Sequence, residues 1–143
     1  MNIKRGYRGY ISSRAFGGER APQHIQNLVI RSYCNDNDLP FLLSATEAAM
    51  PDSFIVLSRL MTEINGLSGI VFYSLQQLPK ESSHRAEIFD TALRAKRELH
   101  FAVERFSFET ASDGTRIEDI LSVAALLPRV FDLREWYEAS GNV

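Results

Sequence analysis

Three apolar segments alternate with three amphipathic segments along the first hundred residues, and this alternation constrains the fold more than any other feature. The apolar segments predict β-strands. The one at Gly69–Tyr73 is apolar continuously rather than at alternate positions, which is typical of a strand covered on both faces. Strands that alternate with helices predict a parallel sheet sandwiched between helices. The expected strands are about Gly6–Ser12, Phe41–Ser44, Gly69–Tyr73, Leu99–Val103 and a short fifth one at Phe106–Phe108.

The amphipathic segments carry apolar residues at helical spacing. The first helix is expected to begin near Pro22, because proline is favoured in a first helical turn. The second is expected to be capped by Asp52 or Ser53 and to stop at Gly66. The expected core stripes are Ile25, Leu28, Val29 and Tyr33 in the first helix, Leu57, Leu60, Met61 and Ile64 in the second, and Ile88, Phe89, Ala92 and Leu93 in the third.

The C-terminal segment, about residues 115–140, is expected to be helical. Thr115-Arg-Ile-Glu118 has the capping-box pattern, which predicts a helix start there. Pro128 should interrupt this helix, and a last one would carry Trp136 and Tyr137. The 143 residues suit one domain with a core at about 6–108. The predicted fold class is therefore α/β, with three α/β/α layers around a mostly parallel sheet of four to five strands.

Composition narrows the function classes. Hydrophobic residues make up 45% of the chain and charged residues 24%, close to the averages for soluble globular proteins. The formal net charge of −2 argues against a generic nucleic-acid coat. Cys34 is the one cysteine, so no internal disulfide is expected, and its place in a helical pattern predicts a core residue. Neither a membrane-length apolar run nor a signal-peptide pattern is present, which favours a cytoplasmic protein without a membrane association.

Polar side chains follow the ends of the expected strands. Ligands of open α/β sheets bind outside the carboxyl ends of the strands, so these side chains are expected around one crevice. Ser12 is the candidate nucleophile of a catalytic site or else a hydroxyl that contacts the ligand, and His24 or Glu104 would move a proton if catalysis occurs. The expected ligand-binding residues are Ser13, Arg14, Arg20, Gln23, Asn27, Tyr73 and Ser74.

Arg14 and Arg20 flank a Phe-Gly-Gly loop, and a planar guanidinium suits a phosphate or a carboxylate. The N–H groups at the start of the following helix would add to such an anion site. A structural role stays open for each residue: serines that satisfy backbone groups, a surface loop, and surface or core histidines such as His100. The three histidines form no cluster with cysteine or acids at metal-ligand spacing, so neither a metal nor a cofactor is expected.

Five phrases stand out in the sequence: Arg-Gly-Tyr-Ile-Ser-Ser-Arg (8–14), Pro-Gln-His-Ile-Gln-Asn-Leu-Val-Ile-Arg (22–31), Leu-Leu-Ser-Ala-Thr-Glu (42–47), Gly-Ile-Val-Phe-Tyr-Ser-Leu (69–75) and Glu-Leu-His-Phe-Ala-Val-Glu (98–104). They resemble the sporadic carbohydrate cluster protein family, small bacterial proteins encoded within carbohydrate biosynthesis loci. The resemblance implies binding or transformation of a phosphorylated, acidic or nucleotide-linked sugar for surface-polysaccharide or activated-sugar synthesis. The alternative is a non-catalytic homo-oligomer, using the Trp136-Tyr137 helix, that scaffolds a neighbouring enzyme.

Tyr-Ile-Ser-Ser at the end of the first strand is followed by a loop and a helix bearing Gln23 and Gln26. This layout is similar, more distantly, to the catalytic domain of serine recombinases of the resolvase and invertase type. The phrase Leu75-Gln-Gln-Leu78 is similar to the recombinase Leu-Asp-Arg-Leu phrase, and Ser12 falls on the nucleophile's position. The resemblance implies a flavodoxin-like five-stranded sheet whose last strand is antiparallel.

The chain departs from the recombinase pattern at the positions that carry charge. Tyr10 stands where an arginine is expected two residues before the serine, and Gln76 and Gln77 replace an acid and an arginine. Phosphoryl transfer to a serine depends on positive charge around the reacting phosphate. A diverged recombinase-like protein without strand exchange is therefore a third hypothesis, and nucleic acid is not the expected partner.

Overall fold

The computed structural model describes residues 5–13, 21–48 and 53–130. Its centre is a five-stranded sheet in the order β2-β1-β3-β4-β5, in which the first four strands are parallel and β5 is antiparallel to β4. The strands are β1 (Tyr7–Ser12), β2 (Phe41–Glu47), β3 (Gly69–Phe72), β4 (Glu98–Phe101) and β5 (Phe106–Phe108). The helices are α1 (Gln23–Asp36), α2 (Ile55–Thr62), α3 (Ser82–Ala95) and α4 (Ala111–Val130), with short 3-10 turns η1 (Ile64–Gly66) and η2 (Leu75–Gln77).

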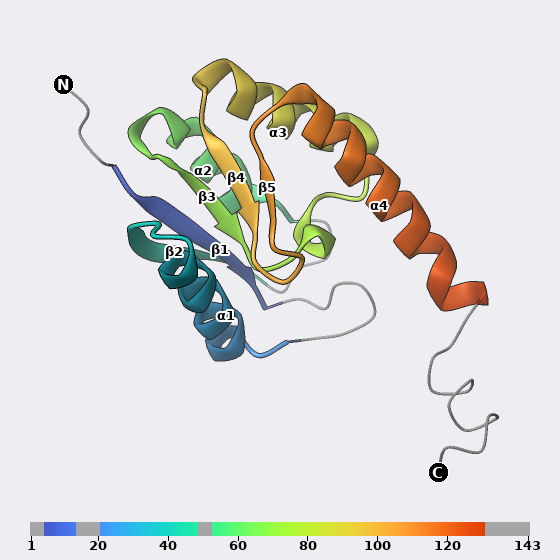
Figure 1. Ribbon diagram of the computed structural model, residues 1–143, viewed down its shortest axis with the longest axis horizontal. Helices are drawn as coiled ribbons and strands as arrows, with labels where there is room; N and C mark the ends of the chain where they lie inside the picture. The colour runs from blue at the N-terminus through green and yellow to red at the C-terminus, as the bar shows by residue number, and fades with distance from the viewer. Residues whose placement is uncertain (1–4, 14–20, 49–52, 131–143) are drawn as a thin grey trace, which may run out of the picture.

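Helices cover both faces of this sheet, which confirms the expected α/β architecture and the antiparallel fifth strand (Figure 1). The core on one face joins Ile30, Tyr33 and Cys34 of α1 to Ile11 and Val71 of the sheet. The core on the other face is larger, because three helices pack there. It includes Tyr10, Phe72, Leu99 and Phe101 from the sheet, Leu57 and Leu60 from α2, Ile88, Phe89 and Ala92 from α3, and Ile117 from α4.

Helix α1 buries a different face from the one its apolar pattern predicts. Its buried residues include Gln26 and Ile30, whereas Ile25 and Leu28 are exposed, so only part of the expected stripe reaches the core. The reason is polar: the Gln26 side chain holds both backbone groups of Ser12 at the end of β1. Turning Gln26 inward moves its neighbour Ile25 outward, since successive residues of a helix lie about 100° apart.

Glu47 at the end of β2 caps the N-terminus of α2 from a neighbouring strand. The N-cap residue of α2 is Phe54, which makes no side-chain capping bond, and Asp52 lies outside the described residues. The Glu47 carboxylate accepts hydrogen bonds from the backbone N–H groups of Val56 and Leu57, both at 3.1 Å. Ser53, one of the two predicted caps, is therefore not the N-cap residue, and an acid from the neighbouring strand binds the first N–H groups of the helix.

Helix α4 begins at Ala111, four residues before the predicted capping box. Asp113 caps it instead, because its carboxylate accepts the backbone N–H groups of Glu109 and Thr110 at 2.9 and 3.0 Å. The helix also continues past Pro128 to Val130, so the predicted interruption is wrong. A proline two residues before the end of the described helix removes only one backbone hydrogen bond. The expected Trp136-Tyr137 helix lies outside the described residues.

A β-bulge distorts the pairing of β1 with β2. Tyr7 is paired with Phe41 but Gly9 with Ser44, so Leu42 and Leu43 together lie opposite one residue of β1. A Cβ atom on Gly9 would lie 2.3 Å from the Ser44 hydroxyl oxygen, which explains the glycine at this position. No helix within the described ranges has the length and apolar character that a membrane span requires.

Candidate functional site

Ser12 lies at the carboxyl end of β1, next to a hydrogen-bonded pair of glutamine side chains. Its side chain is 0% exposed. The Gln26 amide accepts the Ser12 N–H at 3.0 Å and donates to the Ser12 carbonyl at 2.7 Å. Gln77 donates to the Gln26 side-chain oxygen at 3.0 Å and accepts the Tyr73 backbone N–H at 2.9 Å. Two neutral amides therefore tie the end of β1 to the end of β3.

The other expected residues of the first loop and helix lie around this network. Ser13 bonds through its hydroxyl to the Glu47 carbonyl at 3.2 Å, and Asn27 accepts the Ser44 hydroxyl at 2.6 Å. Both contacts attach β1 or α1 to β2. Gln23 and His24 occupy exposed positions in the first turn of α1, and Arg14 and Arg20 lie outside the described residues.

The end of β3 is joined to the turn after β4. The Glu104 carboxylate accepts the Ser74 hydroxyl at 2.8 Å and the Leu75 backbone N–H at 3.0 Å. Ser74 in turn accepts the N–H of Gln76, so Ser74 and Glu104 together cap η2. Glu104, an expected acid–base residue, therefore bonds to Ser74, an expected ligand-binding residue. The other described bonds of this pair hold the backbone N–H groups of Leu75 and Gln76.

The structure brings the expected residues to one sheet edge in two separate groups. Ser12 and Tyr73 belong to the amide network, and Ser74 and Glu104 form the η2 cap. His24 is at the surface of α1. Of the three expected catalytic groups, Ser12 is bonded through its backbone to Gln26, and Glu104 is bonded through its carboxylate to Ser74.

His100 forms a buried polar network near the amino ends of the strands. Its Nδ1 lies 2.6 Å from the Tyr33 hydroxyl and its Nε2 lies 2.7 Å from the Glu98 carboxylate, which also accepts the Tyr7 hydroxyl at 2.9 Å. Burial raises the pKa of Tyr7, and the bond to Glu98 raises it further. Burial likewise raises the pKa of Tyr33. Both phenols therefore stay protonated at neutral pH, and the network is a hydrogen-bonded core histidine with its partners.

The sequence only partly predicts the roles of two glutamines and one acid. The recombinase resemblance includes Gln26 and Gln77, but it does not predict that their side chains bond to one another. Glu47 follows the expected second strand in the sequence, yet it is 1% exposed and caps α2. The alternation of β2 carries a signal for this, because a charged residue two positions after Ala45 shares its buried face. Across the described ranges, no three His, Cys, Asp or Glu side chains gather as they would around a metal ion.

Comparison with solved structures gives the fold a precedent. The N-terminal catalytic domain of TP901-1 integrase matches with a TM-score of 0.58 at 13% identity, over 83% of this chain and 95% of that one. A resolvase family site-specific recombinase from Streptococcus pneumoniae matches with a TM-score of 0.61 at 12% identity, over 86% and 91% of the two chains. The chain has a resolvase-like fold.

Comparisons of sequence add nothing to this. No protein-family model matches the chain, and no curated protein matches it either. The resemblance to the sporadic carbohydrate cluster family thus has no support beyond the phrases that suggested it. The resolvase-like fold agrees with the more distant of the two resemblances, and at 12–13% identity this likeness concerns the fold alone.

Proposed function

We propose that this protein is a non-catalytic relative of recombinase catalytic domains and acts as a self-associating scaffold. The proposal rests on the burial and the hydrogen bonds of Ser12 at the carboxyl end of β1. Ser12 stands where the resemblance puts a nucleophile, but its side chain is fully buried and its backbone is held by Gln26. Such a hydroxyl is in a position to support the fold and in a poor one to attack a substrate.

The hydrogen bonds at the end of β1 favour the same conclusion. Transfer of a phosphoryl group to a serine needs a base for the hydroxyl proton and cations for the phosphate. In the described part of the chain, the neutral Gln26 amide holds the Ser12 backbone and is itself bonded to Gln77, while Arg14 and Arg20 lie outside that part. A neutral amide gives little of the stabilisation that a guanidinium would give to a developing dianion.

Helix α4 supplies the surface for self-association. Its first half packs on the sheet through Ile117, whereas Ile120, Val123 and Leu126 are exposed at intervals of three residues. Leu126 is 62% exposed, and α4 projects past the end of the sheet (Figure 1). Apolar residues in this pattern form one stripe along a helix.

A second copy of this chain is the best-matched partner for the α4 stripe. Residues 120–128 contain no charged residue. A two-fold interface places each surface patch against itself, which an uncharged patch tolerates without repulsion. The proposed assembly is therefore a homodimer in which the two α4 stripes face each other.

Sedimentation velocity at several protein concentrations tests the assembly. Val123→Glu and Leu126→Glu should convert a dimer to a monomer, because each places a charge in an apolar interface. Ala125→Glu is the matched control, since Ala125 is an exposed residue of α4 that lies at least 100° around the helix from each stripe residue. A monomeric wild-type protein, or a dimer that survives both stripe substitutions, would contradict the proposal.

The non-catalytic part needs its own test. The protein is incubated with supercoiled DNA from its native locus and then run on a denaturing gel. We expect no covalent protein–DNA adduct from the wild type and no difference from Ser12→Ala. An adduct that disappears in Ser12→Ala would restore the serine as a nucleophile.

A further inference from the structure

We propose that the outer edge of β2 binds an extended acidic peptide of a partner protein, which would add a strand to the sheet. The site is a hollow of about 560 Å³ lined by Arg8, Arg31, Phe41, Leu42 and Leu43. This proposal names the partner chemistry for the scaffold proposed above. It does not depend on α4, so the two proposals can fail separately.

The backbone of β2 is available for pairing on one side. The sheet order puts β2 at an edge, and within the described ranges its ladder runs to β1 alone. An edge strand carries a row of backbone donors and acceptors that another extended segment can use. The seven residues of β2 span roughly 23 Å, enough to pair with a peptide of similar length.

Apolar side chains at this edge are unusually open to solvent. Leu43 is 76% exposed and the neighbouring Leu42 is also exposed, although both belong to a strand. The bulge opposite Arg8 produces this exposure, because it pushes two consecutive residues out of the regular alternation. Exposed leucines on a strand edge provide the apolar contacts for the side chains of an added strand.

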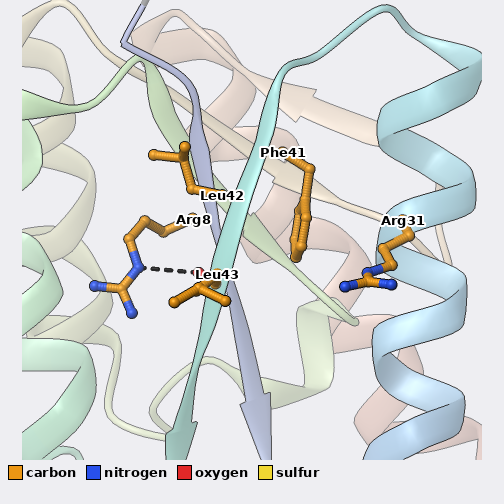
Figure 2. Close-up of a pocket in the computed structure, with 5 residues that line it drawn as sticks. All are labelled: Arg8, Arg31, Phe41, Leu42 and Leu43. Atoms are coloured by element: carbon orange, nitrogen blue, oxygen red, sulfur yellow. Dashed lines mark hydrogen bonds between the residues drawn. The ribbon is translucent and has the colours of Figure 1, made fainter.

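Two arginines at the β2 edge favour a negatively charged partner. Figure 2 shows their guanidinium groups on either side of the strand, with Leu43 between them. Arg31 comes from α1, and its guanidinium carbon lies 5.4 Å from the centre of the Phe41 ring. Arg8 donates to the Leu43 carbonyl at 2.9 Å and makes only a long contact of 3.7 Å with Glu63. Among the described residues, Arg31 has no carboxylate partner.

The positive charges of Arg8 and Arg31 make a second copy of the chain a poor partner for the β2 edge. Pairing of β2 with itself around a two-fold axis would bring the Arg8 and Arg31 groups of both copies to the same interface, and like charges repel. A strand with acidic residues beside apolar ones meets the same surface with complementary charge. The geometry therefore favours an acidic and apolar segment from a different protein.

A seven-residue synthetic peptide that alternates glutamate with valine is the probe. Fluorescence anisotropy measures its binding to the full chain at two salt concentrations. We expect the acidic peptide to bind at least about tenfold more tightly than the same peptide with lysine for glutamate. Raising the salt from 50 to 200 mM should weaken its binding, since exposed charge pairs are screened. An analogue with N-methylated backbone amides should bind much more weakly, because it cannot complete a β-ladder.

Arg31→Glu should weaken the acidic peptide about tenfold, because the charge reversal turns attraction into repulsion. Arg116→Glu is a closely matched control. Arg116 is also an exposed arginine over a phenylalanine ring, 5.1 Å from the centre of Phe106, but it belongs to the opposite side of the sheet. Leu126→Glu, which targets α4, should leave peptide binding unchanged.

Hydrogen exchange locates the peptide. Bound acidic peptide should slow exchange at residues 41–44 and leave β5 unaffected. The proposal is overturned if no peptide binds, if the acidic and basic peptides bind equally, or if Arg31→Glu behaves as Arg116→Glu does. Equal hydrogen exchange at residues 41–44 with and without peptide would also overturn the proposal. It would indicate that the bulge and the arginines only protect the edge strand from pairing.

Discussion

Glu47→Gln is the substitution that most directly probes how this fold is held together. The Glu47 carboxylate is 1% exposed and accepts four hydrogen bonds. One oxygen accepts from the Tyr10 hydroxyl at 2.8 Å and the Leu57 N–H at 3.1 Å. The other accepts from the Val56 N–H at 3.1 Å and the Ser53 hydroxyl at 3.4 Å.

Glutamine has the size of glutamate but only one acceptor oxygen, so its NH₂ group must face one pair of donors. If the oxygen serves Tyr10 and Leu57, the buried Val56 N–H is left without an acceptor. An unsatisfied buried group of this kind costs roughly 1–3 kcal/mol. Loss of the negative charge at the N-terminus of α2 costs about 0.5–1 kcal/mol more. We therefore expect the free energy of unfolding to fall by about 3 kcal/mol, a large share of the total for a domain of this size.

Urea denaturation followed by circular dichroism measures this loss. Glu63→Gln is the matched control, because Glu63 is exposed and its contact with Arg8 spans 3.7 Å, so its loss should change stability by no more than about 0.5 kcal/mol. Amide exchange should also quicken at Val56 and Leu57 in Glu47→Gln. A loss below about 1 kcal/mol, with those amides still protected, would refute the assignment of Glu47 as the cap of α2.

Three further outcomes are expected. Arg85→Ala should lower the free energy of unfolding by about 2–3 kcal/mol in urea titrations, because Arg85 makes two bonds to Glu118 and two to backbone carbonyls, whereas Arg94→Ala, at an exposed pair, should cost about 0.5 kcal/mol or less. Burial opposes ionisation of Asp113, but hydrogen bonds from Glu109 and Thr110 outweigh it and lower its pKa. That stabilisation is present above the unfolded-state pKa and is lost as pH falls through the lower folded-state pKa. Asp113→Asn should therefore lower stability at pH 7, and this loss should become smaller as the pH falls, measured by thermal unfolding. Burial raises the pKa of the Cys34 thiol to about 11, so Ellman's reagent should label Cys34 at pH 8 only in denaturant, and rapid labelling of native protein would contradict this.

The sheet was predictable because its strands obey simple local rules. Gly69–Phe72 is apolar throughout and is buried at all four positions, and Phe106–Phe108 alternates as an antiparallel strand should. Each of these signals lies within a few residues of the feature that it predicts.

The errors concern polar contacts between segments far apart in the chain. The predicted stripe of α1 was only partly right, because Gln26 turns toward Ser12 and apolar periodicity carries no information about that bond. The cap of α2 comes from Glu47 on another strand rather than from a residue just before the helix. The η2 cap likewise needs Glu104, thirty residues after Ser74. A pattern read along the chain has no access to such pairs until the strand order is known.

The two proposed surfaces differ in a way that fixes how an assembly would be built. The α4 stripe is uncharged and suits contact with its own copy, whereas the β2 edge carries two arginines and suits an acidic partner. They also lie apart: α4 packs beside β5, and β2 is at the other edge of the sheet (Figure 1). Dimerisation through α4 would therefore leave both β2 edges open, so two chains would bind two peptides at equivalent sites. Because neither surface includes Ser12, such an assembly does not require a reactive serine, in agreement with the burial of Ser12.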